Sequence, residues 1–516
     1  MNGLKRAKLL GGLLLFSLFF YIGGMVASAH VRAQSNATPI TDEMRAAIDA
    51  YLATQMQELR IPGLALGIVQ GDQIVYSRGY GTADPAGRAV TAQTPFNIGS
   101  TTKSFTALAI MQLVEAGKLE LDAPVQRYLP WFGVADDAAS AQITVHHLLN
   151  QTSGLGTASG RRTPDPKMDM REDGMEELVR GLRNAQLTQP VGQGFQYSNA
   201  NYWTLGLIIQ TVSGQSYEEY IQQHIFTPLA MQHSYTTKAA ASDLATGYRY
   251  WFGRPVAADL ADNRAERPAG HLLASAEDLT HYLISQVNDG RYEDATLLSP
   301  AGIATLHQPA SGDAGYGMGW HRDTINDVPM IWHDGSNANF HANLILIPNG
   351  RWGIVLLVNA NGLLQDGRIT GIANGIASLV SGRPAPVVAT DPFLLGFYGI
   401  AVGLTALALV NVGWSFTRRR HWQSRLVEND SRRGQLTSVL GPLLLNLLLA
   451  GVLLVGLPWL FKAPLFGLIY VFADLGYTLL VGGVVALGWA IVRTALAYQA
   501  LRRTPAALPR VLPATQ

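Results

Sequence analysis

The sequence predicts an α/β (α+β) fold, in which an antiparallel sheet is flanked by helices, followed by an α-helical membrane region. Three observations predict it. Apolar runs of strand length lie near both ends of the first three quarters of the chain, and helical patterns fill the stretch between them. The C-terminal quarter holds three apolar runs, each long enough to supply the roughly 20 residues of a membrane helix.

Four apolar runs of strand length frame the predicted soluble domain: residues 63–69, 73–76, 341–347 and 352–358. Turn residues separate the members of each pair, Gly71-Asp72 in the first and Pro348-Asn349-Gly350 in the second. Residues 371–380 follow as a predicted helix that closes the domain. Strands at both ends with helices between them predict one antiparallel sheet whose edges come from the two ends of the domain.

A buried helix is predicted to begin at Ser100. After Ser100-Thr101-Thr102-Lys103 the chain runs on almost entirely apolar to Val114, and Gly117 marks the expected end. Ser100 would then lie where free backbone N–H groups and the helix dipole stabilise a developing negative charge. Lys103, three positions later, would project from the same face and could accept the hydroxyl proton. The alternative is a Ser/Thr-rich helix start followed by an ordinary lysine.

Composition excludes several classes of function. The chain has 516 residues and a net charge of +1, which gives no bulk electrostatic basis for nucleic-acid binding. Cysteine is absent, which excludes disulfides, thiolate metal sites and a cysteine nucleophile. A cysteine-free chain is also compatible with an oxidising envelope compartment.

Residues 1–33 predict a signal peptide or an N-terminal membrane anchor. Three basic residues precede the apolar run 9–26, and small-x-small patterns that end at Ala29 and Ala33 follow it. The run approaches the length of an uncleaved anchor, so both interpretations stay open. Either one sends the following domain, residues 38–385, across the membrane.

Three transmembrane helices are predicted within residues 390–495. Their apolar runs are residues 393–414, 439–461 and 465–492. Arginines gather between the first and second runs and again after the third, so the positive-inside rule places these segments in the cytoplasm. The sequence therefore predicts a multi-pass protein of the cell membrane, with residues 38–385 on the extracytoplasmic side and residues 496–516 as a cytoplasmic tail.

A serine and a lysine do not by themselves make an acyl-transfer site, because the reaction also needs a proton shuttle and donors for the oxyanion. Two later segments could supply them. Residues 195–202 include Tyr197, whose phenol would ionise more easily beside a protonated lysine. Residues 332–336 include His333 and Gly335 on or beside a strand, where a glycine lets the backbone approach a ligand.

These motifs, in this order, resemble those of the serine β-lactamase and penicillin-binding-protein superfamily, on the branch of class C β-lactamases and their esterase and peptidase relatives. The matching motifs are Ser100–Lys103, Tyr197–Asn199 and His333–Gly335. Connecting segments that also resemble the family are residues 143–155, 268–270 and 316–320. The resemblance covers roughly residues 40–380. It implies a β-lactamase/transpeptidase-like fold with an all-helical subdomain, supplied largely by residues 118–273, and a site in the groove between that subdomain and the sheet.

The resemblance also implies roles. Ser100 would be acylated by the substrate carbonyl, with Lys103 and Tyr197 together acting as the general base. Tyr197 would then activate the water that attacks the acyl-enzyme. The backbone N–H groups of Ser100 and Ser336 would form the oxyanion hole, and Asn199 would orient the Lys103 region or bind a substrate amide.

The third motif departs from the β-lactamase pattern, which places lysine where this chain has His333. A lysine offers a fixed positive charge to a substrate carboxylate, whereas a histidine is mostly neutral near pH 7. We therefore expect β-lactamase activity to be weak or absent, and relatives with histidine here are often esterases, amidases or peptidases. A structural strand-end histidine is the alternative. The pair His146-His147 lacks carboxylates at ligand spacing, so no metal and no other cofactor is expected.

The sequence thus predicts a membrane-tethered extracytoplasmic serine hydrolase of the class C β-lactamase-like type. It would act through an acyl-enzyme on small ester, amide or peptide substrates, including D-amino-acid or cell-wall peptides. Its other partner would be the lipid bilayer, with no nucleic acid and no metal. The alternative is a non-hydrolytic, penicillin-binding-like sensor or wall-peptide binding module. The charge-dense stretch 164–180 predicts a solvated loop or helix, or else a lid over the site.

Overall fold

A computed structural model describes residues 40–161, 170–259, 261–309, 315–429, 431–461 and 463–503. By its internal contacts the chain divides after Pro39 into two units. The predicted signal peptide or anchor, residues 1–33, lies outside the described residues, as do residues 162–169 of the charge-dense stretch and the tail beyond Arg503.

The main sheet of the described residues has seven strands in the order β2-β1-β13-β12-β11-β10-β9, each antiparallel to its neighbours. The strands are β1 (Gly63–Gln70), β2 (Gln73–Gly81), β9 (Tyr316–Gly317), β10 (Trp320–Ile325), β11 (Val328–Ser336), β12 (His341–Ile347) and β13 (Trp352–Val358). The predicted fold class is confirmed, and so are both predicted hairpins, β1–β2 and β12–β13.

The expectation that the edges of the sheet come from the two ends of the domain is correct for β2 and wrong for the C-terminal hairpin, which lies inside the sheet. β1 pairs with β13 along its length, Leu64 opposite Val358, and the edge strands are β2 and β9. The reason lies in burial. Every residue of β12 and β13 is buried, and so is nearly every residue of β1. A strand that is apolar on both faces is stable only inside a sheet that is covered on both sides.

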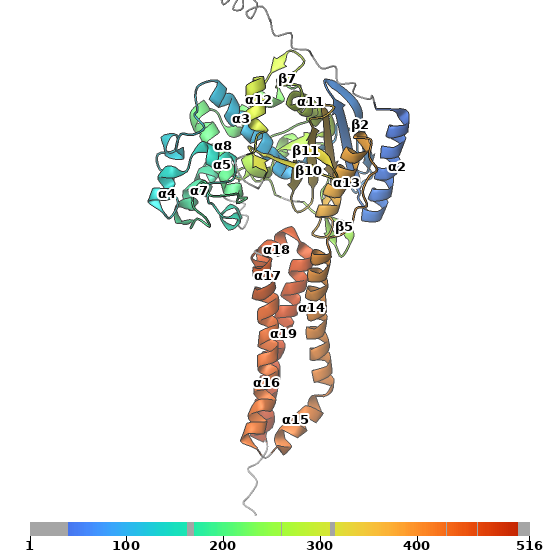
Figure 1. The fold of residues 1–516 in the computed structure, drawn as a ribbon. Helices are drawn as coiled ribbons and strands as arrows, with labels where there is room; N and C mark the ends of the chain where they lie inside the picture. Colours follow the sequence, from blue (N-terminus) through green and yellow to red (C-terminus); the bar gives the residue numbers. More distant parts are fainter. Residues whose placement is uncertain are drawn as a thin grey trace, which may run out of the picture. The chain divides into compact units, whose positions relative to one another are not determined.

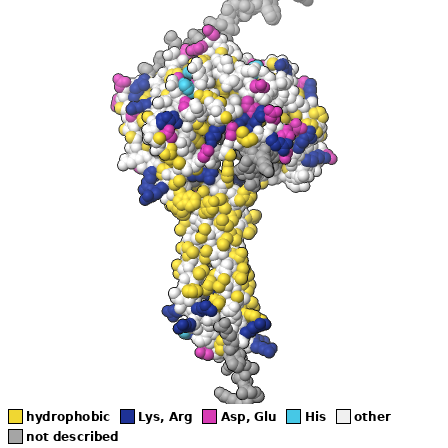
Figure 2. All heavy atoms as spheres, turned by 180° about the vertical axis from the view of Figure 1, so that it is seen from behind, with side chains coloured by type: hydrophobic (Ala, Val, Ile, Leu, Met, Phe, Trp, Pro, Cys, Tyr) yellow, Lys and Arg dark blue, Asp and Glu magenta, His cyan; other side chains and the backbone are white. Residues whose placement is uncertain are grey.

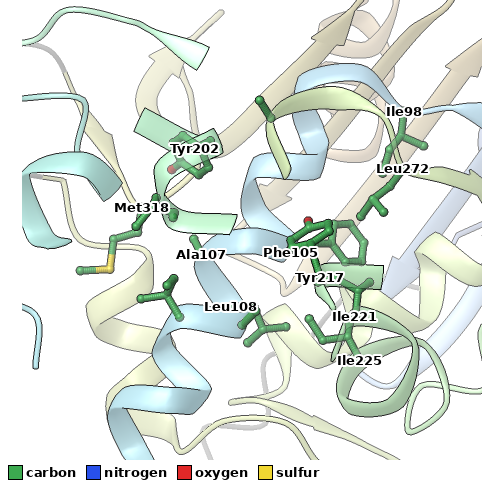
Figure 3. Packing of buried hydrophobic residues seen from close by; sticks show 14 of the residues in the cluster. Ile98, Phe105, Ala107, Leu108, Tyr202, Tyr217, Ile221, Ile225, Leu272 and Met318 are labelled. Carbon is green, nitrogen blue, oxygen red and sulfur yellow. The ribbon is translucent and has the colours of Figure 1, made fainter. Parts of the chain in front are cut away.

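Helices cover the two faces of this sheet. Figure 1 shows α2 and α13 on the side of the sheet away from α7 and α8. The helices that share a hydrophobic core with the sheet include α2 (Asp42–Leu59), α3 (Thr102–Glu115), α11 (Ala276–Val287) and α13 (Asp366–Val380). The smaller of the two domain cores joins α2 and α13 to one face, through residues such as Leu52, Ile354 and Ile372. The larger core packs around Phe105 and Leu108 of α3 (Figure 3).

The regular secondary structure in the described part of the stretch 118–273 is mainly helical, with long connecting loops, which agrees in part with the all-helical subdomain that the resemblance implied. Its helices are α4 (Asp137–Gln142), α5 (Val145–Leu149), α7 (Gly174–Gly181), α8 (Asn199–Ser213), α9 (Tyr217–Ile221) and α10 (Arg267–Gly270). It also contains a hairpin that the sequence did not predict, formed by β4 (Tyr248–Trp251) and β5 (Arg254–Ala257). β4 pairs in parallel with the short strand β14 (Ala360–Asn361), which follows β13 of the main sheet in the sequence.

Short elements complete the domain: β3 (Pro95–Asn97), β6 (Leu273–Ser275), β7 (Arg291–Tyr292), β8 (Ala295–Thr296) and α12 (Pro300–Leu306). β3 pairs with β6, and this pairing is important for the site because Pro95–Asn97 lead directly to Ser100. The strand therefore fixes the entry of the chain into the helix that carries the predicted nucleophile.

Three C-terminal helices are long and apolar enough to cross a membrane: Pro392–Thr417, Arg432–Leu460 and Ala473–Arg502. The elements that form them or connect them are α14 (Pro392–Thr417), α15 (Arg419–Glu428), α16 (Arg432–Gly451), α17 (Leu457–Leu460), α18 (Leu465–Val471) and α19 (Ala473–Arg503). Polar side chains link them, as where Asn411 donates to Asn446 at 2.9 Å. Figure 2 shows apolar side chains along these helices and Lys and Arg side chains gathered at one end.

Candidate active site

Ser100 and Lys103 lie on one face of a continuous helical segment. Gly99–Thr101 form a 3₁₀ turn that runs directly into α3. Lys103 Nζ donates a hydrogen bond to Ser100 Oγ at 3.1 Å. The structure therefore joins the predicted amine and hydroxyl directly, in the geometry that activation of a serine requires.

Lys103 is completely buried and anchored by two further acceptors. Its ammonium nitrogen lies 2.9 Å from Asn199 Oδ1 and 2.6 Å from the carbonyl oxygen of Ala269. Burial lowers the pKa of Lys103 to about 7, although the charges of Asp334 and Glu266 act in the opposite direction. A large fraction of the amine is therefore neutral near pH 7 and able to accept a proton.

Tyr197 contacts both Ser100 and Lys103. Lys103 Nζ lies 4.8 Å from the centroid of its ring, and its side chain is hydrogen-bonded to Ser100. The expectation that the lysine charge eases ionisation of this phenol is wrong. Burial raises the pKa of Tyr197 well above its usual value, and the bond to Ser100 only partly opposes this. Tyr197 is thus a neutral phenol, suited to relay a proton rather than to hold a negative charge.

Strand β11 passes very close to the turn that carries Ser100. A Cβ atom at Gly335 would lie 1.9 Å from the Ile98 carbonyl oxygen and 3.1 Å from the backbone nitrogen of Ser100. Gly99 has a left-handed φ of 52°, and a Cβ there would lie 2.8 Å from the backbone nitrogen of Ser336. Only glycine fits at both positions, and their contact brings the Ser100 and Ser336 backbone nitrogens to one place. Two such donors are what an oxyanion hole requires.

His333 lies on strand β11 and is buried beside the site, with 1% of its surface exposed. Its Nδ1 donates to the Asp334 carbonyl at 2.5 Å, so Nε2 carries the lone pair and faces the Tyr316 hydroxyl at 3.5 Å. Burial lowers the pKa of His333 well below its usual value, with His321 and Lys103 adding to the effect. The ring is a neutral group 6.4 Å from the Tyr197 ring, centroid to centroid, and offers no fixed positive charge.

Hydrogen bonds from the segment 143–155, which resembled the family, and from Thr157 just after it fix the loop before α8. Gln151 adopts a left-handed backbone with φ of 59°, and its Oε1 accepts from the backbone N–H of Ser198 at 2.9 Å. Thr157 Oγ1 donates to the Tyr197 carbonyl at 2.7 Å. These bonds place the phenol of Tyr197 and the amide of Asn199 on the Ser100 side of the loop.

The structure brings together every predicted site residue, and it adds others that the sequence did not identify. The Ala269 carbonyl belongs to the segment 268–270, which resembled the family, but a backbone acceptor has no signature of its own in a sequence. Asp334 acts on Lys103 through its charge, and burial raises the pKa of its carboxyl. Tyr316 lies in a second such segment, 316–320, and its role as a neighbour of His333 depends on strand pairing.

The pair His146-His147 lies elsewhere. His146 faces the Asp122 carboxylate at 3.4 Å, and His147 accepts from the Thr144 backbone N–H as part of a helix cap. Within the described ranges, no group of three or more histidine, aspartate or glutamate side chains is arranged to hold a metal.

Comparison with known proteins gives a consistent result. Residues 48–377 match the family model described as Beta-lactamase. The chain is 30% identical over 429 residues to Protein flp of Staphylococcus aureus strain MW2, covering 82% of this chain and 84% of that one. It is 30% identical to Penicillin-binding protein 4 of Amycolatopsis lactamdurans, over 65% of this chain and 90% of that one. Among solved structures, the octameric penicillin-binding protein homologue from Pyrococcus abyssi matches with a TM-score of 0.57 at 27% identity, covering 70% of this chain and 81% of that one.

Proposed function

Because the chain belongs to the Beta-lactamase family, we propose that it is a membrane-tethered serine hydrolase that acts through an acyl-enzyme on small ester or amide substrates, D-amino-acid and cell-wall peptides included. The observation that carries the proposal is the buried amine of Lys103, hydrogen-bonded to the hydroxyl of Ser100 and with a pKa of about 7. A non-catalytic binding module has no need of a neutral amine held at a nucleophile.

The proposed acylation follows from these contacts. Ser100 Oγ attacks the substrate carbonyl while its proton passes to Lys103, directly or through Tyr197. The oxyanion forms between the backbone N–H groups of Ser100 and Ser336. The proton then returns through Tyr197 to the leaving group, and a water molecule activated by the same pair attacks the ester of Ser100. Asn199 and the Ala269 carbonyl keep Lys103 in place throughout.

The surroundings of His333 favour substrates that carry no negative charge next to it. Where β-lactamases carry a lysine, this site has a buried neutral imidazole, bordered by an aromatic cluster of Phe195, Tyr316, His321 and Trp332. The rings of Tyr316 and His321 are 4.7 Å apart, and His321 stacks on Trp332 at 4.7 Å. Burial lowers the pKa of His321 to about 4, so it is neutral as well. Such a wall favours substrates with no carboxylate on the amine side of the scissile bond, which disfavours penicillins and cephalosporins and, among D-amino-acid peptides, favours those whose terminal carboxyl group is amidated.

Substrate preference is the direct test. Purified full-length protein is expected to hydrolyse p-nitrophenyl esters with a kcat/KM at least about tenfold above that for a chromogenic cephalosporin, since a lost charged hydrogen bond costs about 1.5–3 kcal/mol. D-alanyl peptides complete the panel as amide substrates. A fluorescent penicillin that forms a lasting adduct on Ser100, with no turnover of any ester or peptide, would contradict the hydrolase and support a sensor.

The pH dependence of ester hydrolysis follows from the pKa of Lys103. The base must be neutral to accept the Ser100 proton, and its pKa is lowered to about 7, so kcat/KM is expected to rise with pH and to level off above about pH 8. Below pH 7 the rate should fall about tenfold per pH unit. The measurement uses a substrate that does not ionise between pH 5 and 9. A flat profile across that range would show that Lys103 is not the base.

Membrane attachment and sidedness are part of the same proposal. Three helices have the length and composition of membrane spans. Arginines gather in α15, at the start of α16 and near the end of α19, which the positive-inside rule assigns to the cytoplasm. The opposite ends of α14 and α19 would then face outward, and the hydrolase domain, which precedes α14, would work outside the cell membrane.

A further inference from the structure

A polar cluster lies behind the strand that supplies Ser336. Ser336 on β11 is paired in register with His341 on β12, so their side chains share the face of the sheet that α13 covers. Asp366, the first residue of α13, receives both: Oδ1 accepts from Ser336 Oγ at 2.5 Å and lies 3.1 Å from His341 Nδ1. Asn361 Nδ2 donates to the same oxygen at 3.0 Å. One carboxylate oxygen therefore holds three side chains of the cluster.

The cluster reaches the other side of the proposed oxyanion hole as well. Asn361 Nδ2 donates to the Asn337 carbonyl at 2.8 Å, and Asn337 Nδ2 donates to Asn97 Oδ1 at 2.8 Å. That oxygen also accepts from the backbone N–H of Gly99 at 2.9 Å. Strand β11, which carries Ser336, and the turn that carries Ser100 are thus tied to each other by one continuous chain of hydrogen bonds.

Charge in the cluster is balanced by an ion pair. His341 has no exposed side-chain surface, and the Asp366 side chain is 35% exposed. Burial alone would lower the pKa of His341, but its hydrogen bond and charge interaction with Asp366 outweigh burial and raise it. Burial alone would raise the pKa of Asp366, but bonds from His341, Ser336 and Asn361 lower it to about 2. The hydrogen bond and the charges of the two side chains therefore favour the ionised form of the pair.

Other groups near His341 leave this balance intact. Asp334 of β11 is the second acid that acts on it, and its charge adds to that of Asp366 in raising the pKa of His341, although it makes the smaller contribution. Asn343 of β12 is hydrogen-bonded to His341 and uncharged. Thr370 of α13 lies 3.2 Å from Nε2 through its hydroxyl. Asp366 is therefore the main counter-ion of His341.

We propose that His341 and Asp366 are positioning residues of the hydrolase site: the pair fixes Ser336 beside Ser100, and the positive charge of His341 cancels a carboxylate that would otherwise oppose the oxyanion. The inference rests on the proposed function, because it needs the Ser336 N–H as an oxyanion donor. The physical reason is that a negative charge one side chain away from a developing oxyanion raises the energy of the transition state more than that of the bound substrate.

A double-mutant cycle tests the charge balance. His341→Gln leaves the carboxylate uncompensated, and kcat for a p-nitrophenyl ester is expected to fall about 50-fold with KM little changed, the scale of one nearby charge at an effective dielectric constant of about 20. Asp366→Asn removes the offending charge, so the double variant is expected to recover to within about fivefold of wild type. A merely structural pair predicts that the double variant is at least as slow as either single variant, and that result would overturn the proposal.

The matched control is Arg368→Gln, which removes a charge from the same helix. Arg368 pairs with Glu58 of α2 at 3.4 Å, away from Ser336, so its loss is expected to leave kcat at the wild-type value. The pH profile adds an independent readout. His341 must be charged, so beyond the plateau set by Lys103 the kcat is expected to fall again as His341 loses its proton, and this second, alkaline decline should disappear in the Asp366→Asn variant. A decline that persists there would contradict the role of the pair.

A measurement that needs no catalysis separates this inference from the proposed function. In full-length protein labelled with ¹⁵N-histidine, the His341 signal, assigned by its loss in His341→Gln, is expected to report a charged imidazolium at pH 7 and a neutral ring in Asp366→Asn. A neutral His341 in the wild type would overturn the charge-balance proposal whether or not the protein is a hydrolase. A charged His341 in a protein inert to all esters and peptides would instead contradict the proposed function and, with it, the catalytic role of the pair.

Discussion

Replacing Ser100 with alanine is expected to lower ester turnover by on the order of 10⁴-fold or more, the scale seen when a nucleophile that works as part of a unit is removed. Ser100 Oγ is the group that Lys103 and Tyr197 both reach, so no other hydroxyl in the cluster can take over the attack. Turnover of a p-nitrophenyl ester measures the loss. Mass spectrometry after incubation with a fluorophosphonate probe should show an adduct on wild type and none on Ser100→Ala.

Ser104→Ala is the matched control for the nucleophile. Ser104 lies on α3, one turn after Ser100, and is fully buried, but its hydroxyl donates to the Thr101 carbonyl at 2.8 Å and does not face the site. Its removal is expected to cost about 1 kcal/mol of stability and to leave turnover close to wild type. If Ser100→Ala, purified free of host esterases, kept wild-type activity, the assignment of the nucleophile would be wrong.

The second large effect is expected at Lys103. Lys103→Met keeps the length of the side chain and removes its amine, and turnover is expected to fall about 10³-fold, within the usual range for a general base. Lys103→Arg is the sharper variant, because a guanidinium keeps the charge and the donors but cannot accept a proton near neutral pH. Both variants are expected to lose activity if the amine acts as a base. Kinetics on the same ester panel measure the loss.

Substantial activity in Lys103→Arg alone would show that Lys103 supplies only charge and hydrogen bonds. Lys118→Met serves as the control, since Lys118 lies just beyond the same helix and is exposed. Its replacement is expected to change turnover by less than twofold, as is usual for surface positions. Thermal melting of each variant separates loss of the base from loss of the fold, because Lys103 also donates to Asn199 and to the Ala269 carbonyl.

Several structural features could be predicted from local patterns. The hairpins β1–β2 and β12–β13 follow from apolar runs separated by turn residues, because such signals lie within a few residues of one another. The apolar segment after Ser100 predicted a buried helix, and the structure has α3 there with Lys103 itself buried. The order of the strands in the sheet could not be predicted in this way. β13 lies beside β1 because both strands are buried on both faces, and a local apolar pattern does not indicate which two apolar strands become neighbours.

In the candidate site, too, some residues could be predicted from the sequence and others could not. The motifs that hold Ser100, Tyr197 and His333 are visible in the sequence because each needs particular side chains at short spacing. The Ala269 carbonyl and the pair His341–Asp366 are not, since a backbone oxygen has no residue identity and a histidine on an apolar strand resembles any core residue. The β4–β5 hairpin was missed for a related reason: the resemblance suggested helices throughout that region.

By itself, the sequence determined which chemical groups the three motifs supply and in what order, and it determined the three apolar C-terminal helices, because side-chain identity, spacing and run length are local quantities. Only the tertiary structure decided the protonation states of the side chains in those motifs. It showed Lys103 to be an amine whose pKa is lowered to about 7, Tyr197 a phenol that keeps its proton, and His333 an uncharged ring. The physical reason is that desolvation and hydrogen bonding set the pKa of a group, and both depend on neighbours brought from distant parts of the chain.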